Sequence, residues 1–280
     1  MAGLTDIPGV EIHGKGQKDF VLPVGHIDSQ GKVHDTIILR EMTGVEDDMF
    51  GNDELPFGER VSAVLSACTV KLGDITDQEI IRQAISDDLK MGLPVTEQDR
   101  VAALIYLRRT TLGDTYRFSR TCPRAGCKTE ARNRTLDLRS LEIKKVAEPT
   151  KRRVKVKLPS SKQEAVIKVL TAKGAIEIGR LRFTDKDLKS AALLVRLESL
   201  NGKPITDMRA GLDLIKALPQ ADRNFMRQVT QAMEASVDTD VEVVCSNPIC
   251  GGTWKFPLDV GQGFFLDLDG EVNTQTLTWL

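Results

Sequence analysis

The sequence predicts an α+β fold in which an N-terminal β-hairpin and a helical unit precede a β module that is split by a helical insertion. Three observations predict it. Apolar and polar residues alternate near the N-terminus, apolar residues then recur at helical spacing, and one strand–knuckle–strand pattern occurs twice, far apart in the chain. The two copies of this pattern flank a long segment with helical spacing, so the β module is expected to form from both ends of that segment.

The composition limits the class of protein. The chain has 280 residues, of which 41% are hydrophobic and 28% are charged, enough for one large domain or two ordinary ones. Lys and Arg number 39 against 40 Asp and Glu, so the net charge of -1 provides no overall field that attracts nucleic acid or an anionic membrane. No apolar run approaches the roughly 18 residues of a membrane span, and the start lacks the pattern of a secretion signal. We expect a soluble protein made in a reducing cytoplasm, with no membrane partner.

Residues 19–41 predict the β-hairpin. Two apolar runs, FVLPVGHI and VHDTIILRE, are separated by Ser-Gln-Gly at 29–31, a composition typical of turns between strands. His26 and His34 lie in this hairpin and His13 lies in the arm before it, and none of the three is in a motif with a catalytic Ser or Cys. We interpret them as surface or hairpin residues and expect no enzymatic activity.

Residues 43–113 predict a compact helical unit. Each of its helical segments starts at a Thr that is followed three residues later by an acidic residue, the spacing of a capping box. These pairs are Thr43 with Glu46, Thr76 with Glu79, and Thr96 with Asp99. Glycines at 73, 92 and 113 are expected to end the successive segments, the first of which carries Cys68 on its apolar stripe as a core residue.

Residues 45–54, VEDDMFGNDE, form an acidic run at the start of this unit. Its carboxylates lack the alternating ligand positions of a calcium loop. We interpret the run as a solvated helix face followed by a turn.

Strand-like alternation resumes at Asp114 around a pair of cysteines. In TYRFSRTCPRAGCKTEARNRTLDL, one strand leads into Cys122 and a second strand leaves after Cys127. The segment VEVVCSNPICGGTWKFPLDV repeats this organisation with Cys245 and Cys250, again with a proline between the cysteines. Two such hairpins facing each other would place four thiolates at the corners of a tetrahedron, as in a structural zinc ribbon. The sequence therefore predicts a split, zinc-ribbon-like β module with a four-cysteine zinc site.

Two alternatives to the zinc site remain. Local disulfides could join Cys122 to Cys127 and Cys245 to Cys250, although a reducing cytosol disfavours them, or the thiols could stay unligated in tight turns. The Cys-x4-Cys spacing also departs from the Cys-x2-Cys of many zinc ribbons. If zinc is bound, four thiolates leave no coordination position for water, so the site stabilises the fold and does not catalyse a reaction.

The segment between the two cysteine pairs predicts helices at 185–200, 211–218 and 222–234, which form the helical insertion. Residues 144–157 precede these helices and contain what we interpret as the only dense positive charge of the chain. We favour a solvated linker and an edge strand for this run, and phosphate binding is the alternative.

These patterns divide the chain into five parts. They are an N-terminal arm and β-hairpin at 1–42, the helical unit at 43–113, the first half of the zinc-ribbon-like module at 114–158, the helical insertion at 159–240, and the second half with a C-terminal arm at 241–280. Because the cysteine pairs lie in the third and fifth parts, the fourth must leave the module and return to it.

The order of the segments resembles a known family. LREMTGVEDDMF, QDRVAALIYLRRTTLGDTYRFSRTCPRAGC and VEVVCSNPICGGTWKFPLDVGQGFF resemble the baseplate hub and tail-assembly proteins of contractile-tailed phages, typified by the T-even phages. The likeness spans about residues 35–266. It implies a non-enzymatic structural protein that helps to build or close the tail baseplate. The expected partners are other tail or baseplate proteins and copies of itself in a symmetric assembly, located in the virion or, during assembly, in the host cytoplasm.

Two further expectations concern interaction surfaces. Residues 261–265 and the ending TLTWL place apolar side chains on a C-terminal arm, which we expect either to dock on a neighbouring subunit or to pack on its own domain. The rival function is a nucleic-acid-binding zinc-ribbon protein that uses residues 144–157. Aromatic residues do not interleave with these charges, so we do not expect stacking on single strands.

Overall fold

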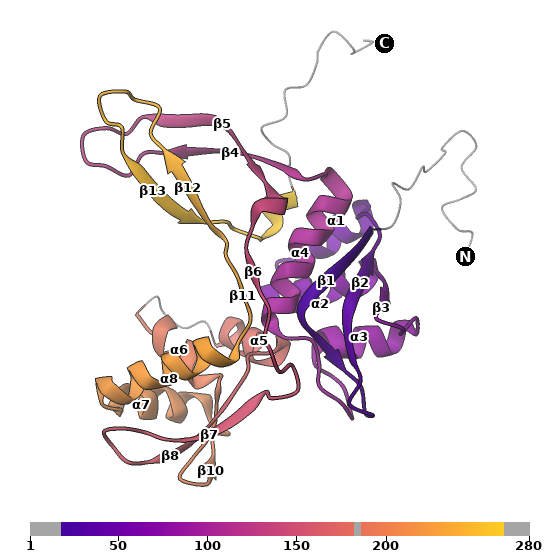
Figure 1. Ribbon diagram of the computed structural model, residues 1–280, viewed down its shortest axis with the longest axis vertical. Coiled ribbons are helices and arrows are strands. Elements are labelled where there is room, and N and C mark those ends of the chain that lie inside the picture. Colours follow the sequence, from indigo (N-terminus) through magenta and orange to yellow (C-terminus); the bar gives the residue numbers. More distant parts are fainter. Residues whose placement is uncertain (1–17, 182–185, 266–280) are drawn as a thin grey trace.

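The computed structural model describes residues 18–181 and 186–265, and shows a mixed α+β chain with several small antiparallel sheets (Figure 1). Its eight α-helices in these residues are α1 (Gly44–Phe50), α2 (Phe57–Cys68), α3 (Gln78–Ser86), α4 (Glu97–Leu112), α5 (Ala172–Arg180), α6 (Leu188–Leu194), α7 (Met208–Ala217) and α8 (Gln220–Met233). The strands are β1 (Lys18–Ile27), β2 (Val33–Leu39), β3 (Thr69–Leu72), β4 (Thr115–Thr121), β5 (Glu130–Asp137), β6 (Ile143–Lys144), β7 (Arg153–Lys157), β8 (Glu164–Lys168), β9 (Leu197–Leu200), β10 (Lys203–Pro204), β11 (Ser236–Val237), β12 (Asp240–Val244) and β13 (Thr253–Pro257).

The predicted N-terminal hairpin is confirmed as β1 and β2, which pair antiparallel with Phe20 opposite Ile37. A third strand, β3, adds to β2. The sequence predicts one helix up to Gly73, whereas α2 ends at Cys68 because Thr69–Leu72 pairs with β2 as a strand. Cys68 is fully buried in the core of this N-terminal unit, as expected. We use "N-terminal unit" for the described residues from β1 to α4.

The capping boxes at the starts of α1 and α4 are confirmed, and the start of α3 differs from the prediction. Asp77, not Thr76, caps α3, because its carboxylate accepts hydrogen bonds from the amides of Glu79 (2.9 Å) and Ile80 (3.2 Å). The helix ends at Ser86 and Asp87 adopts a left-handed conformation with φ of 62°, well before the predicted stop at Gly92.

Asp99 connects α4 to β1. Its carboxylate accepts hydrogen bonds from the amides of Val24 (2.7 Å) and Gly25 (3.1 Å), and from the amide and hydroxyl of Thr96 (both 2.8 Å). Val24 and Gly25 lie in an irregular part of β1, outside its ladder with β2. A fully buried carboxylate is stable here because four donors converge on it.

Residues 159–240 contain a sheet as well as helices. Strands β8, β9 and β10 form a four-stranded antiparallel sheet with β7, in the order β10-β9-β8-β7, and α6, α7 and α8 pack their apolar side chains against it. Of the three predicted helices, 211–218 and 222–234 are confirmed as α7 and α8. The prediction for 185–200 is wrong in its second half, because α6 ends at Leu194 and Leu197–Leu200 pairs with β8. We call β7 to α8 the inserted unit.

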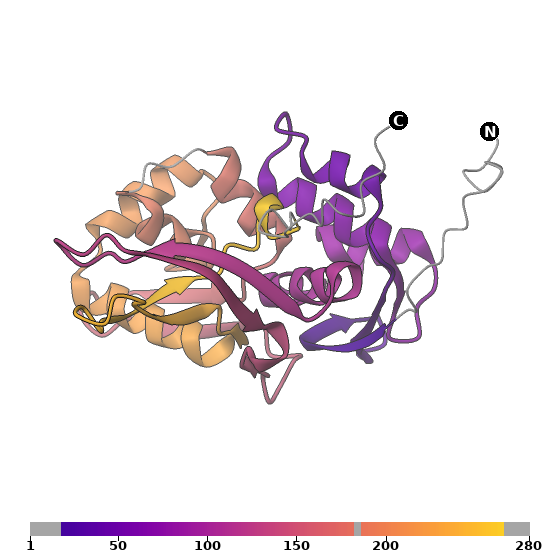
Figure 2. The ribbon, with the colours of Figure 1, turned by 90° about the horizontal axis from the view of Figure 1, so that it is seen from above.

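Two hairpins, β4–β5 and β12–β13, project from the rest of the chain and lie side by side, although they are far apart in the sequence (Figure 1). We call these four strands the cysteine module. Seen from above, β4 and β5 form a long ribbon that leads away from α4 (Figure 2). The short strands β6 and β11 pair with each other, so the chain leaves for the inserted unit and returns from it at the same place.

Buried apolar residues form three clusters, one in the N-terminal unit, one in the inserted unit and one at the base of the cysteine module. The third cluster includes Ile105 of α4, Phe118 of β4 and Val241 of β12. The module is therefore joined to the N-terminal unit by shared apolar packing. Across 18–181 and 186–265, no helix has the length and apolar content that a membrane crossing requires.

Glu46 generates a prediction on stability and pH. Its buried carboxylate is 2.7 Å from an Arg40 guanidinium nitrogen and accepts hydrogen bonds from the amide (2.9 Å) and hydroxyl (2.8 Å) of Thr43. Burial opposes ionisation, but these three donors lower the pKa of Glu46 from 4.5 to about 2. Glu46→Gln should lower the free energy of unfolding by about 1–2 kcal/mol at neutral pH.

The pH dependence has a definite sign. Because the folded-state pKa is below the unfolded value, the contribution of Glu46 is complete above 4.5 and is lost as the pH falls through about 2. Chemical denaturation at steps across this window should show the difference between wild type and variant shrinking with falling pH. Asp48→Asn, on the exposed face of the same helix, is the control. A difference that is constant with pH would contradict this role of Glu46.

Candidate metal centre

The first knuckle connects β4 to β5 through Cys122 and Cys127. The Cys122 amide donates to the carbonyl oxygen of Thr129 (2.9 Å), and the Cys127 amide donates to that of Arg124 (3.1 Å). Lys128 follows in a left-handed conformation with φ of 46°. These bonds turn the chain tightly enough that both cysteine side chains lie on the inner side of the knuckle.

The second knuckle, between β12 and β13, repeats this backbone arrangement. The Cys245 amide donates to the carbonyl oxygen of Gly252 (2.8 Å), and the Cys250 amide donates to that of Asn247 (3.1 Å). Gly251 is left-handed with φ of 51°, at the position equivalent to Lys128. The repeat recognised in the sequence is therefore also a repeat of hydrogen bonds and backbone conformation.

The structure brings all four predicted ligands together. The sulfur atoms of Cys122, Cys127, Cys245 and Cys250 all lie within 4.8 Å of one another. Two of the distances between the hairpins are 3.6 Å, between the Sγ atoms of Cys127 and Cys245, and 4.0 Å, between those of Cys122 and Cys250. The cluster therefore joins the two knuckles, and the predicted alternative of disulfides within each knuckle is not present: all five cysteines are free.

The sulfur spacing fits a tetrahedral thiolate site. A metal–sulfur distance of about 2.3 Å requires sulfur atoms about 3.8 Å apart in a regular tetrahedron. The distances of 3.6 and 4.0 Å between the hairpins lie on either side of this value. Cys122 and Cys245 are buried and Cys127 and Cys250 are half-buried, so the set could hold a metal ion that is largely screened from water.

Neighbouring groups give the thiols different acidities. The Thr129 hydroxyl, 3.4 Å from the Cys127 sulfur, and the Thr129 amide lower the pKa of Cys127 to about 6. The Asn247 amide, 3.4 Å from the Cys245 sulfur, acts in the same direction on Cys245, but burial and the adjacent thiols outweigh it and raise that pKa to about 12. Several thiolates in such a small volume repel one another, and a divalent cation would remove this repulsion.

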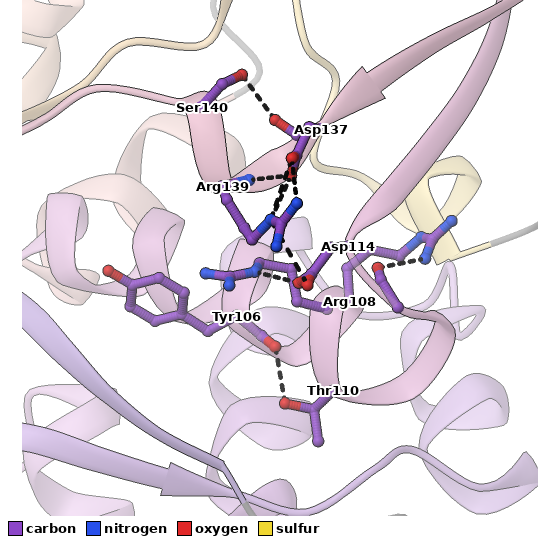
Figure 3. A network of polar contacts seen from close by, with 9 residues as sticks. Tyr106, Arg108, Thr110, Asp114, Asp137, Arg139 and Ser140 are labelled. Atoms are coloured by element: carbon purple, nitrogen blue, oxygen red, sulfur yellow. Dashed lines mark hydrogen bonds and ion pairs between the residues drawn. The ribbon is translucent and has the colours of Figure 1, made fainter.

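A polar network fixes the base of the module to α4 (Figure 3). Asp114, at the start of β4, accepts a hydrogen bond from Arg109 at 2.8 Å and lies 3.8 Å from Arg139. Arg139 also forms a bidentate pair with Asp137, with Nη2 to Oδ2 at 2.6 Å. The network holds both ends of the β4–β5 hairpin near the C-terminus of α4.

Arg108 joins α4 to the last described segment of the chain. Its Nε donates to the carbonyl oxygen of Phe264 at 2.9 Å, and its guanidinium lies 5.9 Å from the ring centres of Tyr116 and Phe264. Phe264 is 1% exposed and Phe265 packs against Phe50 with ring centres 5.5 Å apart. Residues 261–265 are expected either to dock on a neighbouring subunit or to pack on their own domain, and in the structure Phe264 and Phe265 pack within the chain. The TLTWL ending lies outside the described residues.

The histidines differ in part from the prediction. His26 and His34 do lie in the hairpin, but both are buried rather than at the surface. The Nδ1 atom of His26 is 2.8 Å from the carbonyl oxygen of Leu93, and the Nε2 atom of His34 is 3.2 Å from a carboxylate oxygen of Asp28. Burial lowers the pKa of His26. Neither residue belongs to the cysteine cluster, and His13 lies outside the described residues.

Most of the basic run 144–157 is engaged in other contacts. Arg152 is buried and donates to the carbonyl oxygens of Gly25 and Pro94. Three of the other basic residues pair with acidic ones: Lys151 with Glu148, Arg153 with Glu198, and Lys155 with Glu164. Strand β7 belongs to the sheet of the inserted unit.

Sequence reasoning missed a second basic segment, the β4–β5 hairpin itself. Residues 115–139 contain seven cationic residues, Arg117, Arg120, Arg124, Lys128, Arg132, Arg134 and Arg139. The statement that 144–157 holds the only dense positive charge is therefore wrong. A count of charges along the strands around Cys122 would have found this segment.

The anchoring role of Arg108 can be tested by substitution. Arg108→Met leaves the buried Phe264 carbonyl without its donor, and should lower the free energy of unfolding by about 2–4 kcal/mol. Amide hydrogen exchange of residues 258–265 should accelerate more than that of β1. Arg139→Met is the control, because its pair with Asp137 is exposed to solvent and should change the stability much less. Equal losses for the two variants would refute the assignment.

The chain was compared with protein-family models, curated proteins and solved structures. No protein-family model, no curated protein and no solved structure matches it. The candidate metal centre is therefore characterised by its own geometry, and the resemblance to phage baseplate proteins stays a prediction.

Proposed function

We propose that this chain is a non-enzymatic assembly protein of a phage tail baseplate or a related contractile machine, and that a structural zinc ion closes its cysteine module in the manner of a split zinc ribbon. The observation that supports the structural role is the four-sulfur cluster, which joins the two hairpins. It brings together Cys127 and Cys245, 118 residues apart in the sequence, and Cys122 and Cys250, 128 residues apart. A four-thiolate set fills a tetrahedral coordination sphere, so the metal would hold the fold.

Zinc is the metal that this donor set favours. Tetrahedral sites with four thiolates are typical of zinc and of iron–sulfur centres, whereas calcium, magnesium and manganese prefer oxygen ligands. The sulfur atoms are spaced for a single ion, and two knuckles of the same conformation supply them in pairs. The proposed site needs no further ligand from the chain.

The zinc would act as a cross-link between two parts of the sequence. Strands β6 and β11 pair at the base of the module, and the inserted unit lies between them in the chain. Closing the knuckles at the far end would fix the two hairpins relative to each other along their length. Such a rigid projecting module is suited to contacts with other proteins of an assembly.

The baseplate role is supported by the sequence resemblance over about residues 35–266. It is also supported by the engagement of the basic run 144–157 in ion pairs and buried contacts, which disfavours the rival function of nucleic-acid binding through that run. The expected partners are the other proteins of the tail or baseplate.

The zinc proposal predicts the metal content. Protein purified without chelator should contain about one zinc per chain by elemental analysis, and Cys122→Ser or Cys245→Ser should reduce this several-fold. Cys68→Ala is the matched control, since Cys68 lies in the core of the N-terminal unit and should leave the zinc content unchanged. Less than about a tenth of an equivalent of zinc in the wild type, or a full equivalent of iron instead, would reject the zinc site.

The assembly proposal predicts where the protein is found. Mass spectrometry of tails or baseplate intermediates, purified from cells that produce a contractile tail with this protein, should detect it, and loss of the protein should block baseplate completion. Tails that form normally without the protein would reject the assembly role, whatever the metal content.

A further inference from the structure

The β4–β5 hairpin carries an excess of positively charged residues. Residues 115–139 contain the seven cationic residues named above against two acidic ones, Glu130 and Asp137, a net charge of 7 − 2 = +5. Each of these acids is already paired with a neighbouring arginine of the same hairpin, Arg132 and Arg139 respectively. Arg124 and Lys128 are exposed at the knuckle. These two residues place positive charge at the surface beside the four cysteines.

Apolar side chains accompany this charge at the tip of the module. Ile249, in the second knuckle, is 95% exposed, the largest exposure among the large hydrophobic residues of 18–181 and 186–265. Val244, immediately before Cys245, is 55% exposed. We call Lys128, Arg124, Val244 and Ile249 the tip surface. A surface that combines cations with a fully exposed isoleucine is suited to a protein partner, because phosphate backbones offer little for the isoleucine to contact.

A complementary surface lies on the N-terminal unit. The acidic run 45–54 contains five carboxylates and no Lys or Arg. Glu46 is buried and pairs with Arg40, and Asp53 pairs with Arg60. Asp47, Asp48 and Glu54 are exposed. Four exposed large hydrophobic residues accompany it: Val45 (49%), Met49 (38%), Leu55 (40%) and Phe57 (45%). We call residues 45–57 the acidic surface. Like the tip surface, it combines charged side chains with exposed apolar ones, but its charge is negative.

The two surfaces belong to different ends of the molecule. The knuckles point away from α1 and α2 both in the front view and in the view from above (Figures 1 and 2). The tip surface of one chain is therefore placed to contact the acidic surface of another chain rather than its own.

We propose that this protein associates head to tail, with the tip surface of one copy docking on the acidic surface of the next. The proposal rests on the assembly role above and names one contact within it. Exposed charges of opposite sign, Arg124 and Lys128 on the tip surface and Asp47, Asp48 and Glu54 on the acidic surface, favour this contact. Both surfaces also present apolar side chains that are exposed in the single chain. In a head-to-tail dimer, one tip surface and one acidic surface remain free at the two ends. Further copies can bind there, so the assembly extends into a ring or a filament.

Two variants separate the halves of this contact. The first double variant, Lys128→Glu with Ile249→Asp, disables the tip surface. The second, Asp48→Lys with Glu54→Lys, disables the acidic surface. All four side chains are exposed and lie outside the apolar cores, so both variants should fold. Wild type at low salt should form dimers and larger species in analytical ultracentrifugation, and about 0.5 M NaCl should weaken association at least about tenfold. Each variant alone should remain monomeric.

A mixture of the two variants provides the decisive measurement. The intact tip of one variant can bind the intact acidic surface of the other, so the mixture should form a one-to-one dimer and nothing larger. Matched controls carry the same kinds of change elsewhere: Lys145→Glu with Met91→Asp, and Asp213→Lys, all at exposed positions. These should associate like the wild type.

Several outcomes would overturn the proposal. They are a wild type that stays monomeric at low salt, variants that associate like the wild type, or a mixture that stays monomeric although both variants are folded by circular dichroism. Binding of a DNA oligonucleotide that is lost with Lys128→Glu, without self-association, would assign the tip surface to nucleic acid instead. Because these measurements use purified protein, a failure of self-association can be distinguished from a failure of the assembly role, which is tested by whether the protein is found in tails.

Discussion

Four sulfur atoms from two distant hairpins lie within 4.8 Å of one another, and this proximity constrains the path of the chain between the hairpins. The chain must leave the first hairpin, build a separate unit with its own sheet and core, and return to place the second hairpin beside the first. The pairing of β6 with β11 marks where it leaves and returns. The same backbone hydrogen bonds in both knuckles make the two halves equivalent, so each contributes one buried and one half-buried sulfur.

Buried charged side chains fix α4 to β1 and connect the N-terminal unit to other parts of the chain. Asp99 receives amides of β1 at the start of α4, Arg108 donates to the Phe264 carbonyl, and Arg152 donates to the carbonyls of Gly25 and Pro94. In each case a charged group is buried against fixed backbone groups. Such contacts are directional and costly to leave unsatisfied, so they select one arrangement among the many that apolar packing alone would tolerate.

The parts that sequence reasoning predicted depend on neighbours along the chain. The capping boxes at Thr43 and Thr96, the N-terminal hairpin and the two cysteine knuckles are local patterns with local physical causes. The parts that it missed depend on distant pairing. Strands β3 and β9 each begin within three residues of the end of a helix. Such a short apolar segment takes the strand conformation because another strand, β2 or β8, lies beside it. The positive charge of the β4–β5 hairpin is also a local property, because it follows from the residues of 115–139 alone.

The amino-acid sequence alone identified the four candidate metal ligands, because two repeated Cys-x4-Cys units leave four cysteines in equivalent settings and place Cys68 apart from them. It also determined that the segment between them would be an excursion. The three-dimensional arrangement adds that the sulfur atoms of the two knuckles lie within 4.8 Å of one another, that His26 and His34 are buried, and that the Phe264 carbonyl accepts a hydrogen bond from Arg108 of α4. The reason is physical: residue types and spacing specify which groups can bind a metal or bury a side chain, whereas distances across more than a hundred residues arise from the packing of whole units.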